Sequence, residues 1–405
     1  MDPTSPANQA QSAYTRISKS LPALKGWAIL WIVAFHLIGN TRGYLNLGES
    51  LNTLSQGNLK SVIDATLELT IAAGNAGVNI FLVVSGFGLT ASWWKKYGSQ
   101  GTERIPLRDF WQKRVFRIFP LFWISVALAA LLYTANASWA PFGQTLWQSG
   151  PLTLLSVFLA TITTLRNVIP EYYYFLNGAW WYIGLSLQLY FIFPVLIQVG
   201  RQVGWPKLLL GTLLFSFAYR AVFAFASIDS SWITIAFDFF PARVFDFTFG
   251  IYLAITLLTS TQSNHLQNLL FNPLYLPVNL FFFLAGLILK WVDHPLFNIF
   301  EDAVITVSLF CTLICLSQLA SWQPISQVTD RIITPVIGAL FGNYSYGIYL
   351  THMNIYLVLW PIATELLPSY WPRFVVVTLL CCWLGVQFER AYGLIESQFR
   401  RQKIA

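Results

Sequence analysis

The stretch LPALKGWAILWIVAFHLIGN, residues 21–40, has the apolar length of one membrane crossing. A spanning α-helix needs about 20 residues, and inside it every backbone group is hydrogen-bonded without water. Two polar side chains interrupt the stretch, Lys25 near its start and His36 near its end. They are eleven residues apart, which on an α-helix places them on nearly the same face and about 16 Å apart. The sequence therefore predicts a first span with one polar face.

Ionisable residues inside a membrane span are costly, and the default expectation is that they face the protein interior and serve a function. Two simpler explanations stay open at this point. The Lys25 side chain can extend to the lipid headgroups, and His36 can form a hydrogen bond to a neighbouring helix.

The composition is that of a membrane protein. Hydrophobic residues make up 56% of the 405 residues and charged residues only 10%, compared with about 25% charged residues in soluble domains. The apolar runs are long and lack the alternation, about ten residues per strand, of a membrane β-barrel. We therefore predict an all-α polytopic membrane protein, a bundle of about ten transmembrane helices with one re-entrant segment.

We expect three regions along the chain. Residues 1–20 are polar and rich in Ser, Ala, Gln and Pro, a composition that predicts a disordered tail, which we place in the cytoplasm. The first apolar run lacks a signal-peptide cleavage site and is treated as a retained span. Residues 21–395 are expected to form a single transmembrane domain, and residues 396–405 a basic cytoplasmic tail.

Ten apolar runs are long enough to cross the membrane. A further run, residues 152–165, is shorter and rich in Thr, which favours a re-entrant or interfacial segment. The predicted spans are residues 21–40, 72–93, 117–134, 178–200, 206–226, 243–259, 274–291, 303–321, 334–361 and 373–393.

The distribution of charge predicts the orientation. The excess of 24 Lys and Arg over 17 Asp and Glu is small for a nucleic-acid-binding protein, and no nucleic-acid partner is expected. Basic residues precede the first span and cluster between the second and third, which marks these regions as cytoplasmic. If residues 152–165 do not cross, both termini are cytoplasmic and His36 lies in the outer half of the membrane. The acidic residues then expected in outer loops are Glu49, Asp64, Glu68, Asp229, Asp238, Asp293, Glu301 and Asp302.

The four cysteines do not form a metal-binding pattern. Cys311 and Cys315 are one turn apart in one run, and Cys381 and Cys382 are adjacent in another. No CxxC pair or nearby histidine accompanies them. We predict no metal site and interpret all four as small buried hydrophobic residues.

Several stretches, in the same order, resemble the acyltransferase family 3 proteins, integral membrane enzymes that acylate sugars, typically in bacterial surface polysaccharides. The resemblance covers the chain from residue 21 to about residue 390. The matching stretches are Lys25 with His36, GVNIFLVVSGFGLT at residues 77–90, KRVFRIFP at 113–120, WWYIGLSLQLYFIFP at 180–194, Arg243 in PARVFDFTFG, GNYSYGIYLTH at 342–352, and Glu389 with Arg390.

The chain departs from the family pattern at three positions. The family usually has arginine at the position of Lys25, commonly an acidic residue at Asn79, and usually glutamate at Ser186. Lysine keeps the positive charge but lacks the planar fork of arginine. The two other departures leave His36 without an obvious carboxylate partner from those motifs.

The resemblance implies acyl transfer from a thioester to a sugar hydroxyl, and His36 is the expected general base because imidazole titrates near working pH. A covalent acyl-imidazole is the alternative. Arg114 and Arg117 are three residues apart and project from one helix face, and guanidinium groups match phosphate oxygens. We predict that they bind coenzyme A with Lys25, whereas anchoring to lipid is the simpler role of such residues.

Other polar residues in the spans are candidates for binding substrate, although hydrogen bonding between helices is their commoner use. These candidates are Asn79, Ser85, Gln188, Tyr190, Arg243, Tyr346 and His352. The expected donor is acetyl-CoA or another acyl-CoA, and the expected acceptor is a carbohydrate or lipid-linked glycan. We expect the chain to lie among the lipids of the bacterial inner membrane, and its oligomeric state stays open.

Two other functions compete with the enzyme. A secondary transporter of a small anion or lipid-linked sugar would use the buried cations as a substrate path, but the spans show no internal repeat and no matching pair of broken helices. An inactive scaffold of an envelope-polysaccharide complex is consistent with the departures at Asn79 and Ser186.

Overall fold

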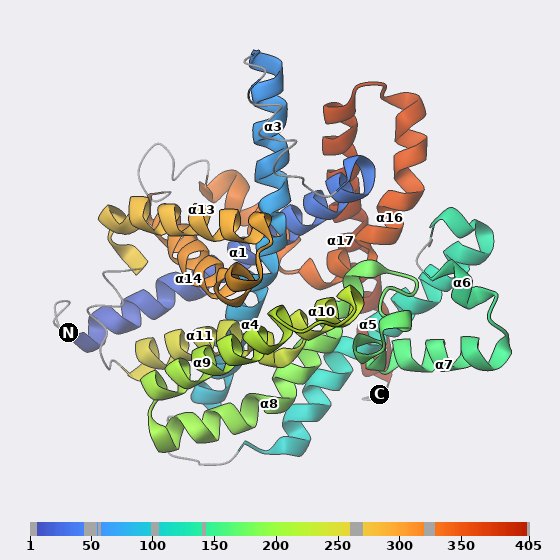
Figure 1. Ribbon diagram of the computed structural model, residues 1–405. Helices are drawn as coiled ribbons and strands as arrows, with labels where there is room; N and C mark the ends of the chain where they lie inside the picture. Colours follow the sequence, from blue (N-terminus) through green and yellow to red (C-terminus); the bar gives the residue numbers. More distant parts are fainter. Residues whose placement is uncertain are drawn as a thin grey trace.

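The computed structural model describes residues 6–43, 55, 58–98, 105–139, 143–259, 270–319 and 329–402. Every regular element within these ranges is a helix (Figure 1). Nine helical segments of the described chain are long and apolar enough to cross a membrane. The chain is therefore an integral membrane protein of the all-α class, and the predicted fold class is confirmed.

The long helices mostly coincide with the predicted spans. They are α1 (Pro6–Arg42), α3 (Leu59–Ala72), α4 (Gly77–Lys96), α5 (Leu107–Ala135), α8 (Trp181–Val203), α9 (Trp205–Ala224), α11 (Phe240–Thr259), α13 (Leu276–Val292), α14 (Pro295–Leu319), α16 (Ser345–Leu366) and α17 (Tyr370–Gln402). Short helical elements connect them: η1 (Ala73–Ala76), η3 (Ala137–Trp139), α6 (Gln144–Trp147), α7 (Pro151–Ile162), η4 (Leu165–Val168), η5 (Pro170–Tyr172), η6 (Gly178–Trp180), α10 (Ser230–Phe237), η7 (Pro273–Tyr275) and η8 (Thr329–Gly342).

The first long helix, α1, is the one around which the others pack. It runs obliquely through the middle of the molecule in Figure 1 and contacts helices from both ends of the chain. One side of α1, including Val33 and Leu37, packs with residues of α5, α8, α16 and α17. Another side, including Ile17 and Ala28, packs with residues of α4, α11, α13 and α14. The helix thus separates two apolar halves of the bundle.

Two glycines let α4 and α11 cross in direct contact. A Cβ atom at Gly86 would lie 2.0 Å from the carbonyl oxygen of Phe247, and one at Gly250 would lie 2.1 Å from that of Val83. Close backbone approach through small residues is a common way for membrane helices to associate. The crossing fixes the rotation of α4, which carries Ser85.

The segment between α5 and α8 forms a small lobe of short helices at one side of the molecule (Figure 1). With 12 residues, α7 is about 18 Å long and shorter than the hydrocarbon layer of about 30 Å. The Arg166 side chain holds the lobe together by donating hydrogen bonds to the carbonyl oxygens of Phe175 at 2.7 Å, Asn177 at 2.8 Å and Tyr173. Burial lowers the pKa of Arg166 to about 10, so this side chain is charged at neutral pH.

The predicted span at residues 334–361 is wrong, because the structure divides it into two elements. The π-helical η8 ends at Gly342, Asn343 and Tyr344 form a turn, and α16 begins at Ser345. A Cβ atom at Gly342 would lie 1.8 Å from the carbonyl oxygen of Pro22. The break between η8 and α16 therefore coincides with a tertiary contact between η8 and α1. The apolar run in the sequence gives no sign of this contact.

The predicted N-terminal tail also differs from the structure. Residues 6–20 are helical rather than disordered, because α1 begins at Pro6 and buries Ala13 and Ile17 completely. At the other end, α17 continues to Gln402, and residues 1–5 and 403–405 lie outside the described residues. Polar segments that extend an anchored helix need no new nucleation, which is the costly step of helix formation.

Candidate active site

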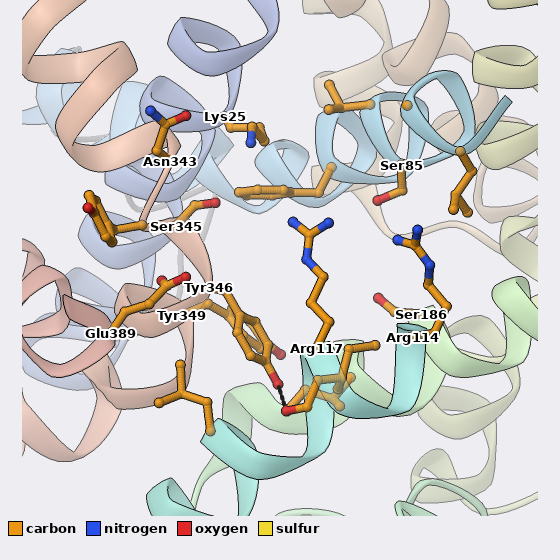
Figure 2. A pocket seen from close by; sticks show the side chains of 18 of the residues that line it. Lys25, Ser85, Arg114, Arg117, Ser186, Asn343, Ser345, Tyr346, Tyr349 and Glu389 are labelled. Carbon is orange, nitrogen blue, oxygen red and sulfur yellow. Dashed lines mark hydrogen bonds between the residues drawn. The ribbon is translucent and has the colours of Figure 1, made fainter. Parts of the chain in front are cut away.

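A cavity of about 1130 Å³ lies between α1, α4, α5, α8, α16 and α17. Figure 2 shows Lys25 on one side of it, facing Arg114 and Arg117 across the opening. The polar residues that line it include Lys25, Ser85, Lys113, Arg114, Arg117, Ser186, Tyr190, Asn343, Ser345, Tyr346, Tyr349, Glu389 and Glu396. The structure thus brings together the three cations that the sequence selected for coenzyme A.

The cavity has an excess of positive charge. Its lining contains four cationic side chains, Lys25, Lys113, Arg114 and Arg117, and two carboxylates, Glu389 and Glu396. No salt bridge within the described part of the chain involves Lys25, Arg114 or Arg117. Cations that line one cavity and form no salt bridge with a described residue are suited to bind an anion.

The two arginines differ in their surroundings. Arg117 is exposed, whereas Arg114 is half-buried, with its guanidinium carbon 5.8 Å from the ring centroid of Phe110 and 5.9 Å from that of Tyr190. The aromatic contacts restrict the Arg114 side chain. Arg117 is free to follow a ligand that enters from solvent.

Glu389 of α17 holds the first turn of α16 beside the cavity. Its Oε2 atom accepts a hydrogen bond of 2.7 Å from the backbone N–H of Gly347, one of the groups that the helix itself cannot pair. A Cβ atom at Gly347 would lie 2.6 Å from the carbonyl oxygen of Gly385. The closing motif of the sequence therefore fixes the element that carries Ser345 and Tyr346.

Tyr346 joins α16 to α5 at the level of the arginines. Its hydroxyl donates a hydrogen bond of 2.8 Å to the carbonyl oxygen of Ile118, the residue that follows Arg117 (Figure 2). Ser85 of α4 and Ser186 of α8 line the cavity near Arg114 (Figure 2). Hydroxyl groups therefore lie beside the cationic region.

His36 does not line this cavity. The last residue of α1 that does is Ile32, four positions earlier, so His36 lies about 6 Å further along the helix axis. A series of rings connects the cavity to His36. Ring centroids are 5.7 Å apart between Tyr182 and Tyr349, 6.0 Å between Tyr349 and His352, and 5.3 Å between His352 and His36.

A family model described as the acyltransferase domain matches residues 18–386, which is most of the chain. This chain belongs to the acyltransferase family. The resemblance inferred from the sequence motifs is confirmed.

Among curated proteins, a Bacillus subtilis (strain 168) protein named "Putative peptidoglycan O-acetyltransferase YrhL" is similar to this acyltransferase chain. The two are 24% identical over 371 residues, which cover 84% of this chain and 53% of that protein. The chain thus spans about half the length of the relative. No solved structure gives a significant match.

Three predicted substrate-binding residues of this acyltransferase line the cavity, namely Ser85, Tyr190 and Tyr346. His352 does not, and it is completely buried on α16. Gln188 accepts a hydrogen bond of 3.0 Å from the backbone N–H of Phe240 and lines a separate, mainly apolar pocket of about 380 Å³.

Arg243 and Asn79 lie in a buried polar network away from the cavity. Arg243 Nη1 is 2.7 Å from Asp302 Oδ2, and Arg220 Nη1 is 2.6 Å from the same oxygen. Asn79 donates a hydrogen bond of 2.8 Å to Thr306 Oγ1. The remaining members are Asp246, Lys290 and Glu301. The prediction that Arg243 and Asn79 contact a substrate is therefore not supported by their positions.

This network also corrects the assignment of two acidic residues to an outer loop. Glu301 and Asp302 lie within α14 and are buried, facing Arg220 of α9. Arg220 was not identified from the sequence. A single arginine in an apolar run carries no sign of its partners, which come from a helix about 80 residues later along the chain.

The four cysteines are buried and form no disulfide among the described residues, as expected for small hydrophobic residues. Within the described ranges, no three His, Cys, Asp or Glu side chains come together as a metal site requires.

Proposed function

We propose that this chain is a membrane acyltransferase that moves an acyl group from acyl-CoA, with acetyl-CoA as the expected donor, to a hydroxyl of a cell-envelope carbohydrate. The observation that carries the proposal is the convergence of Lys25, Arg114 and Arg117 on one large cavity, none of them in a salt bridge with any residue the structure describes. Family membership supplies the reaction class.

The cavity suits a large anionic donor. Its volume of about 1130 Å³ is above the range of about 300–1,000 Å³ that is usual for small-molecule sites. Coenzyme A carries phosphate groups at one end and a thin thioester arm at the other. We place the phosphates against Arg114 and Arg117, with Lys25 completing the charge around them.

The thioester arm would extend along α1 from Lys25 past Ile32 toward His36, residues that share one helix face. His36 would accept the proton of the acceptor hydroxyl while the hydroxyl oxygen attacks the thioester carbonyl carbon. The carbon–sulfur bond then breaks, and the proton held by His36 passes to the departing thiolate. The products are an ester and free coenzyme A.

The rings of Tyr182 and Tyr349 line the inner part of this path. They would keep water from the thioester until an acceptor hydroxyl is present. Ser85 and Ser186, which line the cavity with the arginines, are candidates to donate hydrogen bonds to the carbonyl oxygen as negative charge develops there.

The curated relative suggests the acceptor to test first, an amino-sugar hydroxyl of peptidoglycan. We place the chain in a bacterial inner membrane with both termini in the cytoplasm, so that the donor cavity faces cytoplasmic acyl-CoA and His36 lies toward the outer half. Basic residues next to the cavity, among them Lys113, support this orientation.

The test uses the full chain in lipid nanodiscs with radiolabelled acetyl-CoA and soluble peptidoglycan fragments. Doubly substituted Arg114→Gln/Arg117→Gln protein should show a KM for acetyl-CoA raised about 100-fold or more, since each charged hydrogen bond contributes about 1.5–3 kcal/mol and every 1.4 kcal/mol is tenfold. Arg108→Gln is the matched control, because Arg108 is exposed on the same helix and does not line the cavity.

In the same assay, His36→Ala should abolish transfer while acetyl-CoA still protects the protein against thermal unfolding. Near-normal turnover of His36→Ala would exclude its role as the base. Absence of both transfer and acetyl-CoA binding in the wild-type chain would exclude the proposed function.

A further inference from the structure

Two histidines from distant parts of the chain face each other beside the proposed reaction path. His36 of α1 and His352 of α16 have ring centroids 5.3 Å apart and ring planes inclined by 38°. Each ring has a buried nitrogen that makes no hydrogen bond within the described part of the chain, Nδ1 in His36 and Nε2 in His352. An unpaired buried polar atom is unusual in a folded protein.

The contacts of His352 determine where its proton lies. Its Nδ1 atom is 2.9 Å from the carbonyl oxygen of Tyr349 and 3.2 Å from that of Ile348. Carbonyl oxygens only accept hydrogen bonds, so Nδ1 carries the hydrogen and donates it. In the neutral ring, Nε2 is then an acceptor with a free lone pair.

The helix on both sides of His352 is held in place by the segment before α8. The indole N–H of Trp180 donates a hydrogen bond of 2.9 Å to the carbonyl oxygen of Leu350. Asn177 donates a hydrogen bond of 2.9 Å to the side-chain oxygen of Asn354. His352 is itself completely buried, and these contacts fix the direction in which its acceptor nitrogen points.

His36 is less constrained and has one nitrogen available for chemistry. His36 is partly exposed, but its Nδ1 atom is buried. The solvent-accessible surface of His36 therefore belongs to other atoms of the residue. No described carboxylate forms a salt bridge with either histidine. The acceptor nitrogen of His352 is therefore the candidate orienting group for His36.

We propose that His352 is the positioning residue for His36: its Nε2 atom accepts a hydrogen bond from Nδ1–H of His36, which leaves Nε2 of His36 unprotonated as the base. The inference rests on the proposed function, in which His36 removes the proton of the acceptor hydroxyl. At a centroid separation of 5.3 Å, two ring nitrogens that point toward each other lie about 3 Å apart, which is hydrogen-bond distance. The arrangement follows the general logic of a base held in one tautomer by a third group.

The first test measures the tautomer of His36 directly. The chain contains only four histidines, so ¹⁵N-histidine signals of the protein in nanodiscs can be assigned by substituting one histidine at a time. We expect His36 in the wild type to be protonated at Nδ1 and to change to the Nε2-protonated form in His352→Leu. An identical His36 tautomer in both proteins would overturn the proposal.

The second test separates positioning from a structural role by rescue. Glutamine can place an acceptor oxygen where His352 has Nε2, whereas leucine cannot. We expect kcat to fall about 100-fold in His352→Leu and less than about 10-fold in His352→Gln, with the KM for acetyl-CoA within about 2-fold of wild type. His294→Gln is the control, because His294 is exposed between α13 and α14.

Equal loss of kcat in His352→Leu and His352→Gln, with both proteins retaining wild-type unfolding temperatures, would also overturn the proposal. The two proposals fail separately. A wild-type protein that neither transfers acetyl nor binds acetyl-CoA removes the proposed function, while the His36 tautomer still reports whether His352 accepts its proton.

Discussion

Asp302 is the residue on which the buried ionic network depends. Two guanidinium groups, from α9 and α11, converge on its Oδ2 atom, and Lys290 of α13 is 3.4 Å from Oδ1. A buried ion pair adds little net stability when complete, but removing one partner leaves the others charged and unsatisfied. These ion pairs join the four helices α9, α11, α13 and α14. Loss of any one charged partner is therefore expected to destabilise the contact between them.

Replacing Asp302 by Asn should destabilise the protein by about 3–5 kcal/mol, because Arg220 and Arg243 then lose their shared carboxylate. The measurement is chemical unfolding in detergent, with Asp109→Asn, at an exposed position on α5, as the control. The KM for acetyl-CoA of the folded fraction should be unchanged, since Asp302 does not line the cavity. Unchanged stability would contradict the importance assigned to this carboxylate.

At the residue level, the sequence showed which side chains are unusual but not where their partners lie. Lys25, Arg114 and Arg117 were selected by position and charge, and the structure brings them to one cavity. Arg166 and Arg220 were overlooked, although both are almost completely buried. Their partners are carbonyl oxygens in one case and carboxylates of a distant helix in the other, which no local pattern indicates.

Among the elements, α4 and α11 cross with their backbones in close contact near the cavity. The crossing requires glycine at residue 86, since a Cβ atom there would lie 2.0 Å from a carbonyl oxygen of α11. The glycine of the Ser-Gly-Phe motif thus has a packing role, and the adjacent Ser85 reaches the cavity because the helices can approach.

Gly86→Ala should force α4 away from α11 and lower both stability and turnover, with a stability loss of about 1–3 kcal/mol as for other overpacked sites. Gly88→Ala is a matched control two residues away, because a Cβ atom at Gly88 meets nothing within 4 Å. Thermal unfolding should separate the two variants; Gly88 lines the cavity, so it is a control for stability alone. Equal behaviour would show that the crossing is not rigid.

Helix existence was predictable along most of the chain because each span needs an unbroken apolar run. Helix ends and breaks were less predictable, as residues 6–20 and the turn after Gly342 show. In both cases the decisive contacts come from elsewhere in the structure. Ile17 packs in a hydrophobic cluster with residues of α4 and α11. The backbone of Gly342 lies in close contact with the carbonyl oxygen of Pro22.

At the scale of the whole molecule, the fold identifies the two ends of the helix bundle to which the predicted membrane orientation applies. Arg117 and Ser345 lie at the end of the bundle that contains the cavity. The helix α16 begins there at Ser345 and ends at Leu366, so Glu365 lies at the opposite end of this helix. The hydrogen bond between Thr41 and Tyr370, 2.8 Å, joins the end of α1 to the start of α17. From the charge distribution we predict that the cavity end lies in the cytoplasm.

Cysteines introduced singly at Arg108 and Glu365 test this orientation, because both positions are exposed and the four native cysteines are buried. In intact spheroplasts, a membrane-impermeant maleimide should label Glu365→Cys at once and Arg108→Cys only after permeabilisation. The reverse pattern would place the donor cavity outside the cell and remove its access to cytoplasmic acyl-CoA.

The central position of α1 has a consequence for biogenesis. It is translated before the other described helices, whereas several of its neighbours, η8, α16 and α17, are translated after the rest of the described bundle. Until the ribosome has passed Gly342, the face of α1 that carries Lys25 and His36 lacks these native neighbours. The insertion machinery must shelter this face from lipid for most of synthesis, so a nascent chain arrested before η8 is the form in which quality-control proteases should recognise this protein.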